Sequence, residues 1–275
     1  MNCRSRIFLS ILLLTVSSCH KLNSKKRDPI IFAGTRIIAH HAYLAPSDKL
    51  SSRNYYINAL KTHDGIEVDV QMSQDGTLWL YHNNQMSACG AIKQECLITK
   101  NDLEIKALAE CENKTFSYTK LDDVLTKMEQ DNDGKVISLD IKTWFDSKCS
   151  VYGNNITAYY HNVAFEIVSI VKKHNLEDRV MVESEIAYLL GKIKRNSSIA
   201  CYLSAFGDYR EGVRKALKFG YTGISFQYLF KESINKSDIE ELHKEGLKIQ
   251  LWVVNGDSLT ETAKLLQPDY IQTDD

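Results

Sequence analysis

Several common features are absent from this chain of 275 residues, and each absence narrows its possible functions. The formal net charge is -1, and no long basic run follows the first residues. Nucleic acid is therefore not the expected partner, because its binding depends on Lys and Arg side chains that neutralise phosphates. Closely spaced Cys-x-x-Cys pairs, which are typical of zinc clusters, are missing as well. No Pro-rich or low-complexity linker interrupts residues 35–275, so we expect one domain there.

The apolar run near the N-terminus is too short to cross a membrane in a mature protein. Ile7–Val16 follows Arg4 and Arg6, an arrangement that is typical of a signal peptide. Small residues then precede Cys19 in a pattern that resembles a bacterial lipobox. We therefore expect a lipoprotein signal peptide over residues 1–19, lipidation of Cys19, and a tether over residues 20–34. A plain signal peptide cut nearby, or an uncleaved anchor, is the alternative.

This leader predicts an exported bacterial lipoprotein, anchored to a membrane on the periplasmic or cell-surface side. An oxidising compartment permits disulfides. Of the seven cysteines, five remain once Cys3 leaves with the leader and Cys19 carries lipid, so at least one is unpaired. We predict a bridge between Cys89 and Cys96, which lie seven positions apart, with Cys111 as the competing partner.

Short aliphatic runs alternate with helix-length amphipathic segments along the rest of the chain. The runs show little polar alternation near their centres, which is typical of parallel strands buried on both faces. Strands separated by helices favour an α/β fold, a (β/α)8 TIM-type barrel. A doubly wound sheet is the rival, but it would need a Gly-x-Gly-x-x-Gly loop that this sequence lacks. The predicted strands are Arg36–His40, Gly65–Gln71, Lys135–Ile141, Arg179–Glu183, Ser198–Leu203, Thr222–Phe226, Leu247–Val253 and Tyr270–Thr273.

The helical segments and the exceptions to the alternation complete the predicted fold. Residues 83–118 break the rhythm, so we expect a small insertion after strand two, over the barrel mouth. The chain ends directly after strand eight, which predicts a truncated C-terminal end without the usual last helix. The predicted helices are Leu121–Gln130, Tyr159–His174, Ser184–Ile193, Tyr209–Phe219, Lys236–Glu245 and Ser258–Leu266, the last of them followed by Pro268.

Two carboxylates share one face of the second predicted strand. In Gly65–Val70 the aliphatic residues alternate with Glu67 and Asp69, and a period of two puts both acids on the same side. Neighbouring anionic groups are costly unless something neutralises them, and a hard divalent cation is the common remedy. A solvated acidic face on an edge strand is the plainer interpretation.

Histidines follow two other apolar segments, and the order of all these motifs is informative. The first strand ends in His40-His41-Ala42, then come Glu67-Val68-Asp69-Val70, the turn Ser73–Thr77, and His82-Asn83. This order resembles the glycerophosphodiester phosphodiesterase family, which reads His-Arg-Gly, Glu-x-Asp-Val, an Asp-Gly turn and His-Asp. A match with several parts in order is much more specific than a single motif. The resemblance implies a phosphoric diester hydrolase that releases glycerol 3-phosphate and an alcohol from glycerophosphodiesters.

The resemblance also implies roles for individual residues. It places the two catalytic histidines, a general base and a general acid, at His40 and His82. Three carboxylates would hold one divalent cation, Ca²⁺ or Mg²⁺, because all-oxygen ligation suits a hard ion. These carboxylates are Glu67, Asp69 and Asp140, and the substrate-binding residues would be His41, Lys142, Glu183 and Trp252. A structural ion pair is the alternative role for Lys142, and barrel packing is the alternative for Trp252. Asn255 and Asp274 also fall at the ends of predicted strands.

Four positions depart from the family pattern. His41 stands in place of an arginine that binds phosphate, Ala42 in place of glycine, Asn83 in place of aspartate, and Asp140 in place of glutamate. Two further hypotheses stay open, the second of them because of the departures at His41, Ala42 and Asn83. One is a phosphodiesterase like phospholipases or sphingomyelinase D, which forms a cyclic phosphate. The other is a surface lipoprotein that binds a ligand through a decayed site. On the leading hypothesis the partners are a small phosphodiester substrate and, through the lipid, a membrane.

Overall fold

The structure is a computed structural model that describes residues 34–42, 53–88, 91–109, 118–143, 149, 155–228 and 234–275. The predicted signal peptide, Cys19 and all of the predicted tether except Gly34 lie outside these residues. Within the described part of the chain, no helix combines the length and the apolar character that a membrane span requires.

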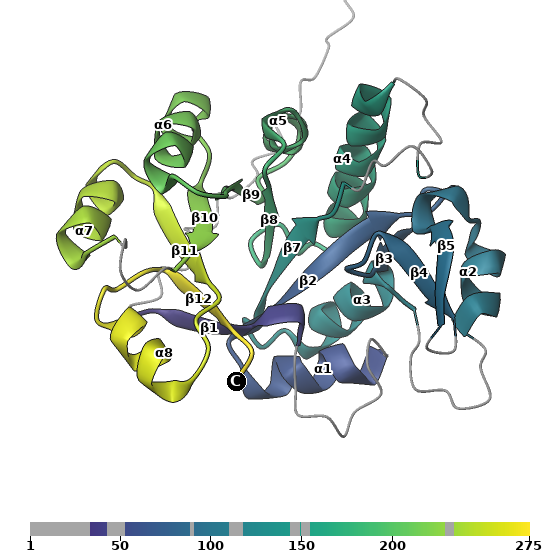
Figure 1. The fold of residues 1–275 in the computed structure, drawn as a ribbon, viewed down its shortest axis with the longest axis horizontal. Helices are drawn as coiled ribbons and strands as arrows, with labels where there is room; N and C mark the ends of the chain where they lie inside the picture. The colour runs from purple at the N-terminus through teal and green to yellow at the C-terminus, as the bar shows by residue number, and fades with distance from the viewer. Residues whose placement is uncertain are drawn as a thin grey trace, which may run out of the picture. The chain divides into compact units, whose positions relative to one another are not determined.

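Eight parallel strands close into a barrel (Figure 1), which confirms the predicted (β/α)8 fold. Strand β1 pairs with β12 on one side and with β2 on the other, and these two pairings close the ring. Strand β2 then pairs with β7, and each later strand pairs with the next. The strands are β1 (Arg36–Ala39), β2 (Gly65–Met72), β7 (Val136–Ile141), β8 (Val180–Ser184), β9 (Ala200–Ala205), β10 (Gly223–Gln227), β11 (Lys248–Trp252) and β12 (Tyr270–Thr273).

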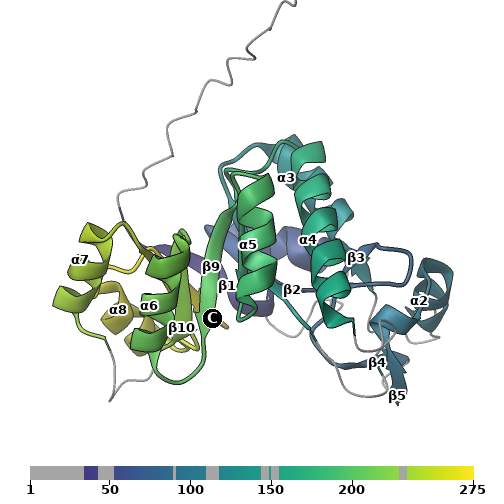
Figure 2. The same cartoon turned by 90° about the horizontal axis from the view of Figure 1, so that it is seen from above.

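Helices lie between successive barrel strands, and local signals set their ends. Asn235 and Asp238 form a reciprocal capping box at the start of one helix, and Gly220 ends another in the left-handed conformation. Helices α4 and α5 lie side by side on the outside of the barrel (Figure 2). The helices are α1 (Arg53–Thr62), α3 (Leu121–Asp131), α4 (Ile156–Lys173), α5 (Ala187–Asn196), α6 (Tyr209–Phe219), α7 (Lys236–Lys244) and α8 (Asp257–Lys264). No helix follows β12 within the described residues.

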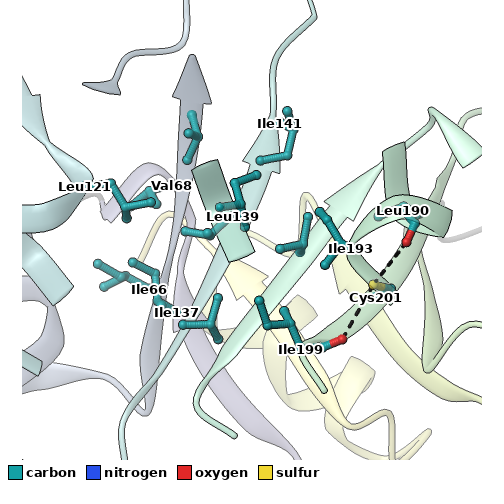
Figure 3. Close-up of a cluster of buried hydrophobic side chains, with 14 of the residues drawn as sticks. Ile66, Val68, Leu121, Ile137, Leu139, Ile141, Leu190, Ile193, Ile199 and Cys201 are labelled. Atoms are coloured by element: carbon teal, nitrogen blue, oxygen red, sulfur yellow. Dashed lines mark hydrogen bonds between the residues drawn. The ribbon is translucent and has the colours of Figure 1, made fainter. Parts of the chain in front are cut away.

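The main apolar core lies between the barrel and its helices (Figure 3). Ile66, Val68, Ile137 and Leu139 alternate along β2 and β7 and are buried there. Truncating a buried Leu or Ile to Ala typically costs about 2–5 kcal/mol, so these positions fix which face of each strand points outward. The intervening residues of the same strands, among them Glu67, must therefore face the barrel interior.

The barrel interior is apolar at the amino end of the strands and polar further toward their carboxyl ends. Ile38, Val136, Met181 and Tyr202 form an apolar cluster inside the barrel. The next inward-facing positions along β7, β8 and β9 are Ser138, Glu183 and Ser204, one strand period further on, and His40 directly follows β1. The site therefore stands on a polar layer inside the barrel rather than on a hydrocarbon one.

The insertion predicted after strand two is present and has its own small core. It comprises β3 (Leu78–Leu80), β4 (Gln85–Ala88), β5 (Ala91–Cys96), the 3-10 helix η2 (Leu97–Thr99), α2 (Asp102–Ala109) and β6 (Thr119–Lys120). Strand β3 pairs antiparallel with β2 and with β6, which ties the insertion to the barrel sheet. The carboxylate of Asp102 accepts hydrogen bonds from the side chains of Ser73, Thr77, Trp79 and Lys120. This single acid thus links the two ends of the insertion to the turn after β2.

A disulfide joins Cys96, at the end of β5, to Cys149, which follows β7. The predicted pairing of Cys89 with Cys96 is therefore wrong, and Cys89 and Cys111 lie outside the described residues. Proximity in sequence is a poor guide here because the fold brings together cysteines that are 53 positions apart. Cys201 is free and buried, which confirms that at least one cysteine is unpaired.

Candidate active site

The carboxyl ends of β1, β2, β7 and β12 bring charged side chains together at one rim of the barrel. His40 and His41 form the short 3-10 helix η1 (His40–Ala42) directly after β1. Strands β2 and β7 pair in register, with Asp69 opposite Asp140. Because β12 lies beside β1, the chain directly after β12 also reaches this rim. Parallel strands in a closed barrel make this convergence unavoidable.

Three carboxylates lie close enough to share one ion. Glu67, Asp69 and Asp140 each offer an oxygen, and these oxygens all lie within 4.8 Å of one another. The ammonium of Lys142 lies 2.6 Å from Asp140 Oδ2 and 3.0 Å from Asp69 Oδ1. Asp69 Oδ1 is buried and accepts no hydrogen bond of good geometry, so its contact with Lys142 is electrostatic. Hard oxygen donors, deep burial and an oxygen without a hydrogen bond together fit a Ca²⁺ or Mg²⁺ ion.

The electrostatics of these acids reflect their burial and their neighbours. Burial raises the pKa of Glu67 well above its ordinary value, and the charge of Asp69 adds to this effect. Burial also acts to raise the pKa of Asp69, but the hydrogen bond and charge of His41 outweigh it and lower that pKa to about 2. Burial opposes the charge of Lys142, yet Asp140 and Asp69 raise its pKa above the ordinary value. Positive charge supplied from outside would therefore stabilise the ionised form of Glu67.

His40 is held by a carboxylate from the other end of the chain. Its Nδ1 lies 2.8 Å from Asp274 Oδ1, and Asn255 donates a hydrogen bond to Asp274 Oδ2 at 2.5 Å. Asn255 Oδ1 in turn accepts from the backbone N–H of Asp274 at 3.0 Å. Burial, followed by the neighbouring His41, lowers the pKa of His40, and Asp274 partly opposes that effect. Asn255 and Asp274 thus fix the orientation of the His40 ring.

His41 has a left-handed backbone conformation, which few residues other than glycine adopt. Its φ and ψ are 49° and 22°, and Ala42 follows with a φ of 51°. The backbone N–H of His41 donates to Glu67 Oε2 at 2.8 Å, and its Nδ1 lies 2.6 Å from Asp69 Oδ2. Burial lowers the pKa of His41, but the hydrogen bond from its ring to Asp69 outweighs this, and the net pKa is raised. The glycine that the family pattern has at Ala42 would relax this turn.

His82 completes the rim from the segment after β3. Its ring packs edge-on against His41 with centroids 4.9 Å apart, and its Nδ1 lies 3.0 Å from Asn83 Oδ1. The ring is exposed to solvent, in contrast to His40. The structure therefore brings both predicted catalytic histidines to the same rim, with His41 in contact with each of them.

This combination of barrel, carboxylates and paired histidines agrees with the comparisons to known proteins. The family model described as "Glycerophosphoryl diester phosphodiesterase family" matches residues 54–275. The chain belongs to this family. It is accordingly a phosphoric diester hydrolase. A comparison with curated proteins found no match.

Solved structures of other family members share the fold of this phosphodiesterase. One from Silicibacter pomeroyi is 16% identical with a TM-score of 0.70, and the match covers 88% of this chain and 90% of that one. One from Parabacteroides distasonis is 18% identical with a TM-score of 0.69, covering 88% and 93%. A phosphodiesterase from Oleispira antarctica, solved in complex with the product sn-glycerol-3-phosphate, is 14% identical with a TM-score of 0.66, covering 88% and 93%.

Glu183 lies in the polar layer beneath the rim of this phosphodiesterase. Its carboxylate accepts hydrogen bonds from Ser138 at 2.9 Å, Ser225 at 2.6 Å, Gln250 at 2.9 Å and Gln272 at 2.8 Å. Burial, with a contribution from the charge of Asp140, raises the pKa of Glu183 to about 7 despite these donors. The direct substrate contact predicted from the sequence would require Glu183 to give up one of these partners.

An aromatic pair stands on the opposite side of the rim. Trp252 ends β11 two positions after Gln250, whose side chain reaches Glu183 inside the barrel, so both point toward the barrel axis. Phe206 follows β9, and its ring packs edge-on against Trp252 at 5.5 Å between centroids. Phe206 is 67% exposed. The rim is therefore charged over β1, β2, β7 and β12 and aromatic over β9 and β11.

Three residues that the structure places at this rim have no role predicted from the sequence. Asn255 and Asp274 fall at the ends of predicted strands, but their link to His40 depends on the closure of the barrel between β1 and β12. Phe206 comes shortly after a predicted strand. It lies two residues beyond Ser204, so in an extended segment the two side chains share one face, and this spacing could have indicated that Phe206 lies at the rim.

Proposed function

We propose that this enzyme hydrolyses glycerophosphodiesters to glycerol 3-phosphate and an alcohol, with one divalent cation and two histidines as general base and general acid. The observation that carries the proposal is the convergence of three carboxylates and two histidine rings at one rim of the barrel. The product complex of the Oleispira antarctica phosphodiesterase, which has the same fold, supports the choice of substrate.

Glu67, Asp69 and Asp140 would hold the cation, and their oxygen donors favour Ca²⁺ or Mg²⁺. When bound, such an ion polarises the phosphoryl oxygen and offsets the charge that builds up on it. Lys142 brings a second positive charge to the same carboxylates. In the structure it forms ion pairs with Asp140 and Asp69, and we propose that it also binds the substrate phosphate.

The contacts of the two histidines suggest how they divide the proton transfers. The carboxylate of Asp274 accepts the Nδ1–H of His40, so the neutral ring carries its lone pair on Nε2. That nitrogen lies 3.9 Å from Glu67 Oε2, on the side of the carboxylates. We assign the general base to His40 for this reason. His82, at the solvent-exposed side of the rim, then acts as the general acid that protonates the departing alkoxide.

A second candidate substrate is favoured by the aromatic half of the rim. An exposed Phe206 against Trp252 is a surface on which an apolar group can be buried. A lysophospholipid carries such a group on the same phosphodiester. Two reactions are possible on this substrate, and phosphorus NMR of the products distinguishes them. A phosphate monoester indicates hydrolysis, whereas a cyclic phosphate indicates the reaction of the sphingomyelinase D type.

We also propose that the enzyme is an exported lipoprotein. The Cys96–Cys149 disulfide supports an oxidising compartment, in line with the leader and with Cys19. Replacing Cys19 by Ala should move the protein from the membrane fraction to the soluble fraction. Equal membrane association of the two forms would contradict lipidation at this residue.

The central test is hydrolysis of glycerophosphocholine by the purified enzyme with and without EDTA. We expect EDTA to abolish activity, Mg²⁺ or Ca²⁺ to restore it, and Glu67→Gln to lower kcat by at least about 10²-fold. Full activity in EDTA or in the variant would contradict the mechanism. Binding of a glycerophosphodiester without turnover would favour the decayed ligand-binding site instead.

A further inference from the structure

A second group of metal-binding side chains overlaps the carboxylate site. His41, Asp69 and His82 each offer one ligand atom, and these atoms all lie within 4.8 Å of one another. The group contains two imidazoles and one carboxylate, whereas the site of Glu67, Asp69 and Asp140 contains oxygen donors alone. Two imidazole nitrogens with a carboxylate oxygen suit a borderline cation, Zn²⁺ above all, and leave a coordination position for water.

Asp69 lies between the two groups and turns one oxygen toward each. Its Oδ2 lies 2.6 Å from His41 Nδ1, while its Oδ1 lies 3.0 Å from Lys142, which contacts Asp140. A carboxylate with this arrangement can contribute one oxygen to each of two neighbouring cations, as in two-metal sites. The oxygen that faces His41 is therefore a different one from the oxygen that contacts Lys142 beside Asp140.

The backbone holds His41 toward this position. The left-handed conformation of His41 and the hydrogen bond from its N–H to Glu67 direct the ring between Asp69 and His82. Asn83 lies 3.0 Å from His82 Nδ1, and such a second partner commonly orients a histidine that binds metal through its other nitrogen. The exposure of His82 leaves the group open to ions from solution.

We propose that His41, Asp69 and His82 form a second cation site that prefers Zn²⁺ to Mg²⁺ and Ca²⁺. Binding replaces the proton shared by His41 and Asp69 with the metal, and the proton is released to solvent. The site depends on the histidine that this chain has where the family pattern has an arginine. A consequence that rests on the proposed function is inhibition, because a nitrogen of His82 that ligates zinc cannot deliver a proton to the leaving group.

The direct test measures metal binding rather than activity. Enzyme saturated with Mg²⁺ is titrated with Zn²⁺ by calorimetry, and with Co²⁺, whose visible absorption bands report nitrogen ligation. We expect one equivalent of either ion to bind to the wild type, and at least tenfold weaker binding to His41→Ala and to His82→Ala. His243→Ala is the matched control, because His243 is equally exposed and also pairs with a carboxylate, that of Asp269. It should bind Zn²⁺ like the wild type.

Three results would overturn the proposal: no zinc binding by the Mg²⁺-loaded enzyme, unchanged binding in both His41→Ala and His82→Ala, or an equal loss in His243→Ala. Circular dichroism and Mg²⁺ binding show whether each variant is folded, and His41→Gln, which keeps a polar side chain, replaces His41→Ala if that variant unfolds. Inhibition of glycerophosphocholine hydrolysis by Zn²⁺ should require His41. Zinc binding without any hydrolysis would count against the proposed function alone, and hydrolysis without zinc binding against the second site alone.

Discussion

Asp274 and His40 are separated by 234 positions in the sequence, yet their side chains lie 2.8 Å apart. The contact orients the His40 ring and sets which nitrogen carries the proton. Asn255 holds the other oxygen of Asp274, so the carboxylate cannot rotate freely. The orientation of the proposed base therefore depends on Asp274 and Asn255.

Replacing Asp274 by Asn should lower kcat by about 10²-fold, because the ring loses the carboxylate that orients it. Asp274 acts to raise the pKa of His40, so its removal should lower that pKa further. A base with a lower pKa stays unprotonated in more acidic solution, so the acid limb of kcat/KM should move to lower pH. The measurement is a pH profile of both enzymes. Asp275→Asn is the control, since Asp275 contacts Gly256 and Thr273 instead of His40. If the acid limb of kcat/KM does not move in Asp274→Asn, Asp274 does not orient His40.

Glu183 should make the stability of the enzyme depend on pH. Its pKa of about 7 in the folded state lies above the ordinary value of 4.5, so the folded state binds this proton more tightly. The corresponding stability is fully present below pH 4.5 and is lost as pH rises through about 7, a change of up to about 3 kcal/mol. Glu183→Gln should remove this dependence. Urea unfolding of both forms between pH 4.5 and 8 measures it, and parallel curves would contradict the assignment.

The insertion illustrates how short elements are fixed by tertiary contacts. Strands β3 and β6 have three and two residues, too few for a repeating pattern, and Asp102 and the Cys96–Cys149 disulfide hold this part of the chain to the barrel. A sequence pattern can indicate that such a segment departs from the β/α alternation. It cannot indicate which side chains meet across it.

Removing the disulfide by the double substitution Cys96→Ala and Cys149→Ala should lower the free energy of unfolding by about 2–4 kcal/mol. The physical reason is that the bond closes a loop of 53 positions and thereby restricts the unfolded chain. Denaturant unfolding of the wild type with and without a reductant is the matched comparison. Equal stability of the wild type and the double variant would show that the Cys96–Cys149 bond contributes nothing.

Cys201 should resist alkylation in the native enzyme, because burial raises the pKa of its thiol to about 12.

The aromatic ends of β9 and β11 should select among substrates. Phe206→Ala removes an exposed ring and should raise KM about 3–10-fold for a short-chain lysophosphatidylcholine, with little change for glycerophosphocholine. Phe165→Ala on α4 is the control, because Phe165 is also exposed, at 64%. Kinetics below the micelle concentration measure both substrates. An equal change for both would exclude a role for Phe206 in recognising the apolar group.

At the scale of the whole enzyme, much of the barrel could be predicted from the sequence, because buried parallel strands appear as aliphatic runs between amphipathic helices. The face shared by Glu67 and Asp69 could also be predicted, since it depends on local alternation alone. The contact of His40 with Asp274 could not, because it requires the ring to close between β1 and β12. The pairing of Cys96 with Cys149 could not be predicted either, because it joins the insertion after β2 to the segment after β7. The left-handed backbone at His41 and Ala42 has no sequence signal, because neither residue is a glycine.

The same closure of the ring has a practical consequence for work with this enzyme. Asp275 follows Asp274 directly, and its own carboxylate and carbonyl contact Gly256 and His63. A change that displaces Asp275 would therefore also move the neighbouring carboxylate that orients His40. Activity measured on variants at Gly256 or His63 would report this displacement as well as the substitution itself.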